Sequence, residues 1–256
     1  MVIIFRCTTL PIFFKLVLNC MKHICYYCNE IATTKEHTPP KCFFPKKKDL
    51  PSGSPDYRKN LITVPSCEKH NTGRSKDDEY TAVSIIMHSD NSDLAFSLLM
   101  SKWIDVLVRQ NASLGKLIFS RSTPVLVPYL HGDLLIPGKT LAIAYERERI
   151  DQVIKSIAYA LYYHESNYKD KWKGECIIKS PKFLMPDLSL NPEHDYLVRA
   201  SQAFNELGLE KKGGHPNIFY YQIHKFKDKG WAIKMVFYQS IIFFALPCSP
   251  ASKLII

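Results

Sequence analysis

Two short pairs of metal-ligating residues constrain this chain more than any other feature of its sequence. Cys25 and Cys28 are separated by two residues, and the same spacing separates Cys67 from His70. This spacing lets each pair curl around one ion as a knuckle, and thiolates together with an imidazole suit tetrahedral zinc. The alternative is a set of unrelated buried cysteines and a surface histidine. The sequence therefore predicts a structural zinc ion, Zn2+, held by these four residues.

Length and composition are those of a globular protein. The chain has 256 residues, of which 46% are hydrophobic and 23% charged. These values exclude wholesale disorder, collagen-like repeats and a protein with several membrane spans. The segment that holds the two knuckles has few large aliphatic side chains, so metal binding is expected to contribute to its folding free energy.

The basic excess is unevenly distributed along the chain. The formal net charge is +10, yet residues 81–167 carry eight Lys/Arg and eight Asp/Glu, so the excess lies at both ends. A local run of three lysines occupies positions 46–48. An acidic partner is expected, and nucleic acid is the commonest one.

Cysteine usage indicates a reducing compartment. Six of the eight cysteines fall in the first 67 residues, namely Cys7, Cys20, Cys25, Cys28, Cys42 and Cys67. A disulfide scaffold would be shorter and rich in cysteine throughout, whereas spaced pairs in a longer chain indicate metal binding. We therefore expect a cytoplasmic protein in which Cys42, Cys176 and Cys248 are free thiols.

The first twenty residues are expected to be an upstream extension, with Met21 as the natural start. The apolar stretch 10–18 is much shorter than the roughly 20 residues that a membrane-spanning helix needs. No membrane association is predicted.

The pattern of the remaining chain predicts an α+β fold. A small zinc-stabilised module, residues 21–80, is expected to precede a mixed helical and antiparallel-sheet domain, residues 81–256, which selects a substrate or partner. Strands are predicted at 33–40, 61–64 (closed by Pro65), 217–226, 231–238 and 240–246, and helices from 75, at 92–111, 147–164 and 194–207. Extended apolar pieces are expected between 123 and 144. The 219–238 hairpin is expected to have one apolar and one mixed face.

Within the module, a further set of residues resembles the HNH endonuclease superfamily. The set is Cys25-x2-Cys28, Glu36-His37 followed by Pro39-Pro40-Lys41, Asn60-Leu61, Cys67-x2-His70-Asn71 and Lys76. The resemblance covers roughly residues 24–80 and follows the order of the family's motifs. Glu36 replaces the more usual Asp, and His70 stands where the family's knuckle usually has a fourth cysteine. The resemblance implies a ββα-metal fold and phosphodiester hydrolysis.

The chemistry of phosphodiester cleavage assigns roles to these residues. His37 is the natural general base, since an imidazole titrates near neutral pH. On an extended segment, Glu36 would point away from His37 unless the strand bends or ends there. The resemblance implies that Glu36 and Asn71 share one catalytic cation, Mg2+ or Mn2+, and that Asn60 braces the loop that carries the base.

The loop between the base and Asn60 is basic and is expected to contact phosphates. The predicted contact residues are Lys41, Lys46, Lys47, Lys48, Arg58 and Lys59. Phosphate contacts position a protein without specifying bases. DNA is the expected substrate ahead of RNA.

Two other interpretations remain open at this point. The first is a non-catalytic zinc module that binds nucleic acid or protein, with Glu36 and His37 packing a knuckle. The second is an enzyme of defence or of mobile elements whose toxic activity is held in check.

Overall fold

The computed structural model describes residues 23–88, 91–109, 113–131, 134–181, 192–226 and 230–248. The predicted extension 1–20, with Cys7 and Cys20, lies outside the described residues, as does Met21. Among the described residues, none of the helices combines the length and the apolar character needed to cross a membrane.

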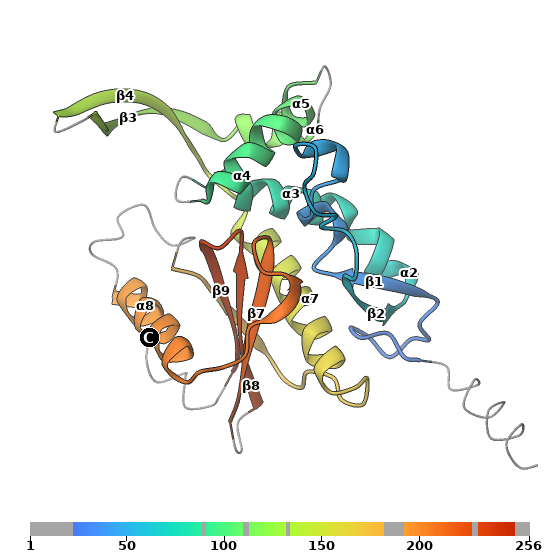
Figure 1. The fold of residues 1–256 in the computed structure, drawn as a ribbon. Helices are drawn as coiled ribbons and strands as arrows, with labels where there is room; N and C mark the ends of the chain where they lie inside the picture. The colour runs from blue at the N-terminus through green and yellow to red at the C-terminus, as the bar shows by residue number, and fades with distance from the viewer. Residues whose placement is uncertain are drawn as a thin grey trace, which may run out of the picture.

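The N-terminal part is a two-stranded hairpin followed by short helices (Figure 1). Strands β1 (Thr34–Thr38) and β2 (Ile62–Ser66) pair antiparallel, with Glu36 opposite Val64. The excursion between them holds the 3-10 turns η1 (Lys41–Phe43) and η2 (Lys47–Asp49). Helices α2 (Glu68–Asn71), η3 (Thr72–Arg74) and α3 (Ser75–Ile86) follow β2. The predicted strands and the helix from residue 75 are confirmed.

One boundary prediction in this part was wrong. Pro65 lies inside β2, opposite Lys35, instead of closing the strand. A two-stranded hairpin leaves one edge of each strand without a partner, so a residue that lacks an N–H is tolerated there.

The middle of the chain forms a helical layer and a long β-ribbon. The predicted helix 92–111 is observed as one run made of α4 (Asp93–Leu98), the π-helical turn η4 (Leu99–Trp103) and α5 (Ile104–Val108). Helix α6 (Ser113–Phe119) leads into β3 (Ser122–His131), which pairs antiparallel with β4 (Leu134–Ile143). This ribbon projects from the body of the molecule (Figure 1).

The C-terminal part is a five-stranded antiparallel sheet with a helix on each face. The strand order is β5-β9-β8-β7-β6. The elements are α7 (Arg147–Glu165), β5 (Cys176–Lys179), α8 (Pro192–Glu206), β6 (Lys212–His215), β7 (Phe219–Phe226), β8 (Gly230–Phe237) and β9 (Ile241–Pro247). Apolar residues of α7 belong to the same core cluster as Ile233 and Phe243, whereas those of α8 cluster with Ala232 and Phe244. The predicted α+β class is confirmed.

The expected mixed face of the 219–238 hairpin is in fact covered. Residues Ala232 to Phe237 of β8 are buried without interruption, because α8 packs on the face that the sequence left polar. Lys234 is buried there, and its ammonium group donates to Ser201 O and Asn205 Oδ1, both at 3.2 Å.

The two predicted units share one hydrophobic core. Phe43 and Phe44, from the excursion, belong to the same cluster as Ile154 of α7 and Phe237 of β8. The first knuckle packs on the other end of α7, where Tyr26 meets Tyr163. Helix α7 thus positions the N-terminal hairpin against the sheet.

Candidate metal centre and catalytic site

Four side chains from two separate turns converge at the end of the N-terminal hairpin. The ligand atoms of Cys25, Cys28, Cys67 and His70 all lie within 4.8 Å of one another. The sulfur atoms of Cys28 and Cys67 are 3.8 Å apart. His70 Nδ1 lies 3.1 Å from the sulfur of Cys67 and 3.8 Å from that of Cys25.

Local backbone structure holds both halves of this cluster. In the first, the Cys25 N–H donates to Glu30 O at 2.8 Å, which closes a tight turn. In the second, Cys67 is the N-cap of α2, so its sulfur and His70 lie one helical turn apart. The ring of Tyr27 stacks on His70 with centroids 4.6 Å apart and fixes the imidazole.

The spacing of these atoms fits a tetrahedral ion. With zinc–sulfur bonds of about 2.3 Å, neighbouring ligands of a tetrahedron lie about 3.7 Å apart. Burial, together with the charge of Arg74, lowers the pKa of His70, so its imidazole is neutral, as a ligand must be. Burial raises the pKa of Cys25, but backbone hydrogen bonds from Cys67, Cys28 and Tyr27 outweigh it and lower the pKa to about 7. The four residues could hold a metal ion such as zinc.

Glu36 lies on the inner side of β1. Its side chain is 6% exposed and accepts a hydrogen bond of 3.5 Å from Ser66 Oγ. Burial raises the pKa of Glu36 to about 8; the charge of Asp78 adds to the increase, while a hydrogen bond from Tyr26 and the charge of Arg74 oppose it.

His37 lies on the opposite side of the same strand. Strand β1 continues through Thr38 without a bend, so the alternation of sides expected for adjacent strand residues is retained. His37 is half-buried. Burial lowers its pKa, and the charge of Lys41 lowers it further, so the imidazole is neutral near pH 7 and able to accept a proton.

Asn71 connects the second knuckle to the inner side of β1. Its amide nitrogen donates to Thr34 Oγ1 at 3.0 Å and to Lys35 O at 3.3 Å. Thr34 and Glu36 are two residues apart and therefore share one side of the strand. Asn71 therefore lies on the side of β1 to which the Glu36 side chain points.

Asn60 is exposed and immediately precedes the segment that enters β2. Its φ of 57° lies in the left-handed region, which asparagine tolerates better than most residues. Arg58, two residues earlier, braces the loop that follows His37. The Arg58 guanidinium donates to Phe44 O at 2.9 and 3.0 Å and to Lys41 O at 3.0 Å.

The predicted lysines all lie on the surface. Lys41, Lys59 and the run 46–48 are exposed. Lys46 is the N-cap of the single turn η2, which contains Lys47 and Lys48, and the Lys46 N–H donates to the carboxylate of Asp49 at 3.0 Å. The exposed lysines therefore lie along the segment that follows His37, and the hydrogen bonds of Arg58 to Lys41 O and Phe44 O hold that segment.

A buried polar cluster beneath Glu36 was missed by sequence reasoning. Tyr26 Oη and Ser156 Oγ are 3.0 Å apart, and Arg74 also donates to Ser156. Asp78 is buried near Arg74, and burial raises its pKa to about 7 although the charge of Arg74 lowers it. The i,i+4 spacing of Arg74 and Asp78 was the one signal that could have indicated this pair.

Comparison with known proteins finds no matching family model, no matching curated protein and no matching solved structure.

Proposed function

We propose that the chain is a metal-dependent endonuclease that hydrolyses phosphodiester bonds, with His37 as the general base that activates water. The observation that carries this proposal is the state of His37 on the outer side of β1. Its imidazole is half-buried, burial and the charge of Lys41 lower its pKa and so favour the neutral form, and the exposed lysines of the excursion follow it. A neutral base beside cationic groups suits attack on a phosphate.

The proposal assigns two metals to different residues. Cys25, Cys28, Cys67 and His70 would hold a structural zinc, which fixes the hairpin. Glu36 and Asn71 would hold the catalytic Mg2+ or Mn2+ on the inner side of β1, opposite to His37, since both offer oxygen ligands. When bound, such a cation stabilises negative charge on the phosphate and the leaving oxygen. Asn60 supports the loop from its left-handed position.

The substrate, compartment and protein class follow from the same argument. Exposed Lys41, Lys46, Lys47, Lys48 and Lys59 would neutralise backbone phosphates, and we propose DNA as the first substrate to test. A reducing compartment such as the cytoplasm keeps ligand thiols available, and the six described cysteines are free. These features are those expected of the HNH superfamily.

One observation favours a second function, a non-catalytic zinc module that binds nucleic acid or protein. Glu36 is almost fully buried against Ser66 and Tyr26, an environment in which a carboxyl group can serve packing alone. In that case His37 would also be a packing residue.

Plasmid nicking distinguishes the two functions. The full chain is incubated with supercoiled DNA and, separately, RNA, in Mg2+ or Mn2+, and compared with His37→Ala. We expect a loss of about 10²–10⁴-fold in rate, the usual contribution of a general base. His224→Ala is the matched control, because His224 is also half-buried but lies on β7. A folded wild type without nicking, or equal rates for wild type and His37→Ala, would refute the nuclease.

Glu36→Gln tests the proposed cation separately. The substitution keeps the shape of the buried side chain but removes the carboxyl group that can lose its proton to a bound cation, so the nuclease proposal expects loss of the metal-dependent rate. Glu30→Gln, on the exposed knuckle turn, is the control. Unchanged metal dependence in Glu36→Gln would remove Glu36 from the cation site.

A further inference from the structure

The β3–β4 ribbon is an arm that reaches away from the rest of the molecule. Each strand is 10 residues long, and they pair in register from Ser122 with Ile143 to His131 with Leu134. Figure 1 shows the ribbon extending beyond the helical layer, with neither face covered by a helix. A two-stranded hairpin in water is marginally stable by itself, so a ribbon of this length needs a surface to rest on.

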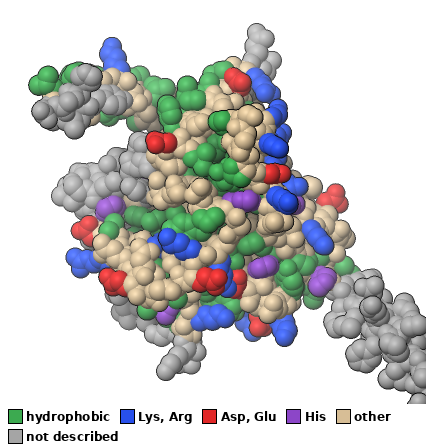
Figure 2. Space-filling view, viewed as in Figure 1, with side chains coloured by type: hydrophobic (Ala, Val, Ile, Leu, Met, Phe, Trp, Pro, Cys, Tyr) green, Lys and Arg blue, Asp and Glu red, His purple; other side chains and the backbone are tan. Residues whose placement is uncertain are grey.

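The arm is apolar and almost free of charge. Leu126 is 69% exposed and Leu134 68%, and Ile136 and Leu141 are also exposed. Lys139 is the one Lys, Arg, Asp or Glu residue in the two strands. Figure 2 shows green side chains along the arm at the upper left. Such a surface suits a protein partner, because binding to nucleic acid depends on neutralising phosphates.

Prolines interrupt both edges of the arm. Pro128 lies directly opposite Pro137, and since neither has an N–H, this pair cannot be a hydrogen-bonded one. The N–H positions at 128, at 124 four pairs away, and at 137 therefore point outward, and all three are occupied by proline. Each edge thus has gaps in its row of outward donors, which weakens strand addition and favours binding through a face of the arm.

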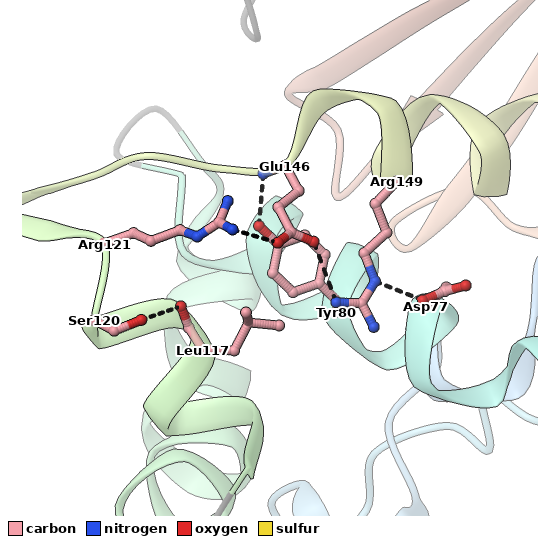
Figure 3. Close-up of polar contacts among 7 residues, drawn as sticks. All are labelled: Asp77, Tyr80, Leu117, Ser120, Arg121, Glu146 and Arg149. Atoms are coloured by element: carbon pink, nitrogen blue, oxygen red, sulfur yellow. Dashed lines mark hydrogen bonds and ion pairs between the residues drawn. The ribbon is translucent and has the colours of Figure 1, made fainter.

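The root of the arm is fixed to the body by a polar network (Figure 3). Arg121, which precedes β3, forms a 2.8 Å ion pair with Glu146, which follows β4. The Glu146 N–H donates to Tyr80 Oη at 2.8 Å. Arg149 binds both Glu146 and Asp77 of α3. The arm is thus held in one direction before it meets a partner, which reduces the entropy cost of binding.

The same chain offers a complementary surface on the helix 93–108. Its exposed face carries Phe96, Met100 and Val108, the first and last of which are 64% and 65% exposed. Two acids of this helix, Asp93 and Asp105, are exposed as well. Lys139 shares one face of the arm with Leu126, its cross-strand partner, and with Leu141. The arm and this helix therefore match in apolar character, and exposed acids of the helix are available to Lys139.

We propose that two copies of this chain form a symmetric dimer in which the arm of each packs on the 93–108 helix face of the other. The 81–167 region, which contains both surfaces, has no net charge, so two copies approach there without the repulsion of a +10 chain. Leu126 and Leu141 contact the apolar helix residues, and Lys139 pairs with Asp105. Each copy supplies one arm and one helix face, and both are occupied in the dimer. The assembly is therefore closed, and a third copy finds no free surface of this kind.

The area of such an exchange is close to the lower limit for a specific dimer. The arm is about 33 Å long and about 10 Å wide, but the 93–108 helix is only about 24 Å long, so the helix limits each contact. Reciprocal burial of two arm faces and two helix faces then covers about 1,000 Å², near the lower end of the range of specific protein interfaces. One arm without its reciprocal contact would cover half of that area and would fall below this range.

Sedimentation equilibrium of the full chain at several concentrations, with nucleic acid removed, tests the proposal. We expect the wild type to sediment at twice its 29.5 kDa. Leu126→Glu, on the arm, and Val108→Glu, on the helix, should each weaken the dimer at least about tenfold. Leu207→Glu is the matched control, because Leu207 is 54% exposed and lies after α8, and it should remain a dimer.

A charge exchange checks that the two surfaces meet each other. Lys139→Glu should weaken the dimer, and Lys139→Glu combined with Asp105→Lys should restore it, which general loss of folding could not do. A monomeric wild type, Leu126→Glu dimerising like Leu207→Glu, or a mass that rises without a plateau would each overturn the closed dimer. The proposal is independent of the nuclease activity.

Discussion

At the scale of single residues, Glu165 joins helix α7 to two strands of the sheet. It is the last residue of α7, and its carboxylate accepts from Tyr221 Oη of β7 at 2.8 Å and forms an ion pair with Lys212 of β6. Burial raises the pKa of Glu165, but the hydrogen bonds from Lys212 and Tyr221 and the charge of Lys212 outweigh it, so the pKa is lowered.

This shift predicts a pH-dependent contribution to stability. Because the folded-state pKa lies below the unfolded value, the contribution is complete above the unfolded pKa, about 4.3, and is lost as the pH falls through the folded value. Glu165→Gln should lower the free energy of unfolding by about 1–2 kcal/mol at pH 7. In urea titrations from pH 7 to 3, this difference should close below about pH 4. Glu148→Gln, exposed on the same helix, should change little; a difference that stays constant with pH would exclude the mechanism.

Residue-scale prediction succeeded where the relevant contacts are local in the chain. The convergence of Cys25 with Cys28 and of Cys67 with His70 follows from two-residue spacing, and the opposite sides of Glu36 and His37 follow from strand alternation. The contact between Arg74 and Ser156 spans 82 positions in the chain, so no local pattern indicates it.

At the scale of elements, the N-terminal hairpin has few strand contacts of its own. Strand β1 pairs with a single partner, and the excursion between the strands consists of short 3-10 turns and loops. A metal ion held by both knuckles would tie the two ends of the hairpin together and would compensate for the small number of strand contacts.

Removing one ligand should therefore release the metal and destabilise the protein. Cys67→Ser should lose the one bound zinc expected per chain and lower the midpoint of thermal unfolding by about 10 °C or more. A chelator should bring the wild type to the same midpoint. Cys248→Ser is the control, since Cys248 is a free thiol outside the cluster. Metal content measured by atomic absorption checks this, and full occupancy in Cys67→Ser would contradict the assignment.

Elements with a strong period were predictable, and those defined by distant partners were less so. Helix α7 was evident from its apolar spacing, β7 and β8 from the pattern of a hairpin with one apolar and one mixed face, and β9 from its apolar run. The 122–143 segment showed extended pieces, but its long pairing was not predicted, because three prolines obscure the strand pattern. One face of β8 is covered by α8, whose Phe204 clusters with Ala232 of that strand. These two residues are far apart in the sequence, so no local pattern indicates the contact.

At the scale of the whole molecule, burial does not stop at the boundary predicted near residue 80. Phe43, Phe44 and Tyr80 lie on the N-terminal side of that boundary, yet each is buried in the cluster that includes Met235 and Phe243 of the sheet. Separating the two parts would expose these side chains to water at a cost of roughly 1.5–3 kcal/mol each. The N-terminal hairpin and the sheet are therefore expected to unfold together.

Coincident unfolding is the measurable consequence. The three tryptophans, Trp103, Trp172 and Trp231, all lie after residue 80, whereas the metal ligands all precede it. Tryptophan fluorescence and release of metal to a coloured chelator should then give the same urea midpoint, as two-state unfolding requires. Far-UV circular dichroism, which follows the helices of both parts, serves as the control and should give this midpoint as well. Metal release at a distinctly lower urea concentration would show that the hairpin unfolds by itself, and the shared core would then contribute little to its stability.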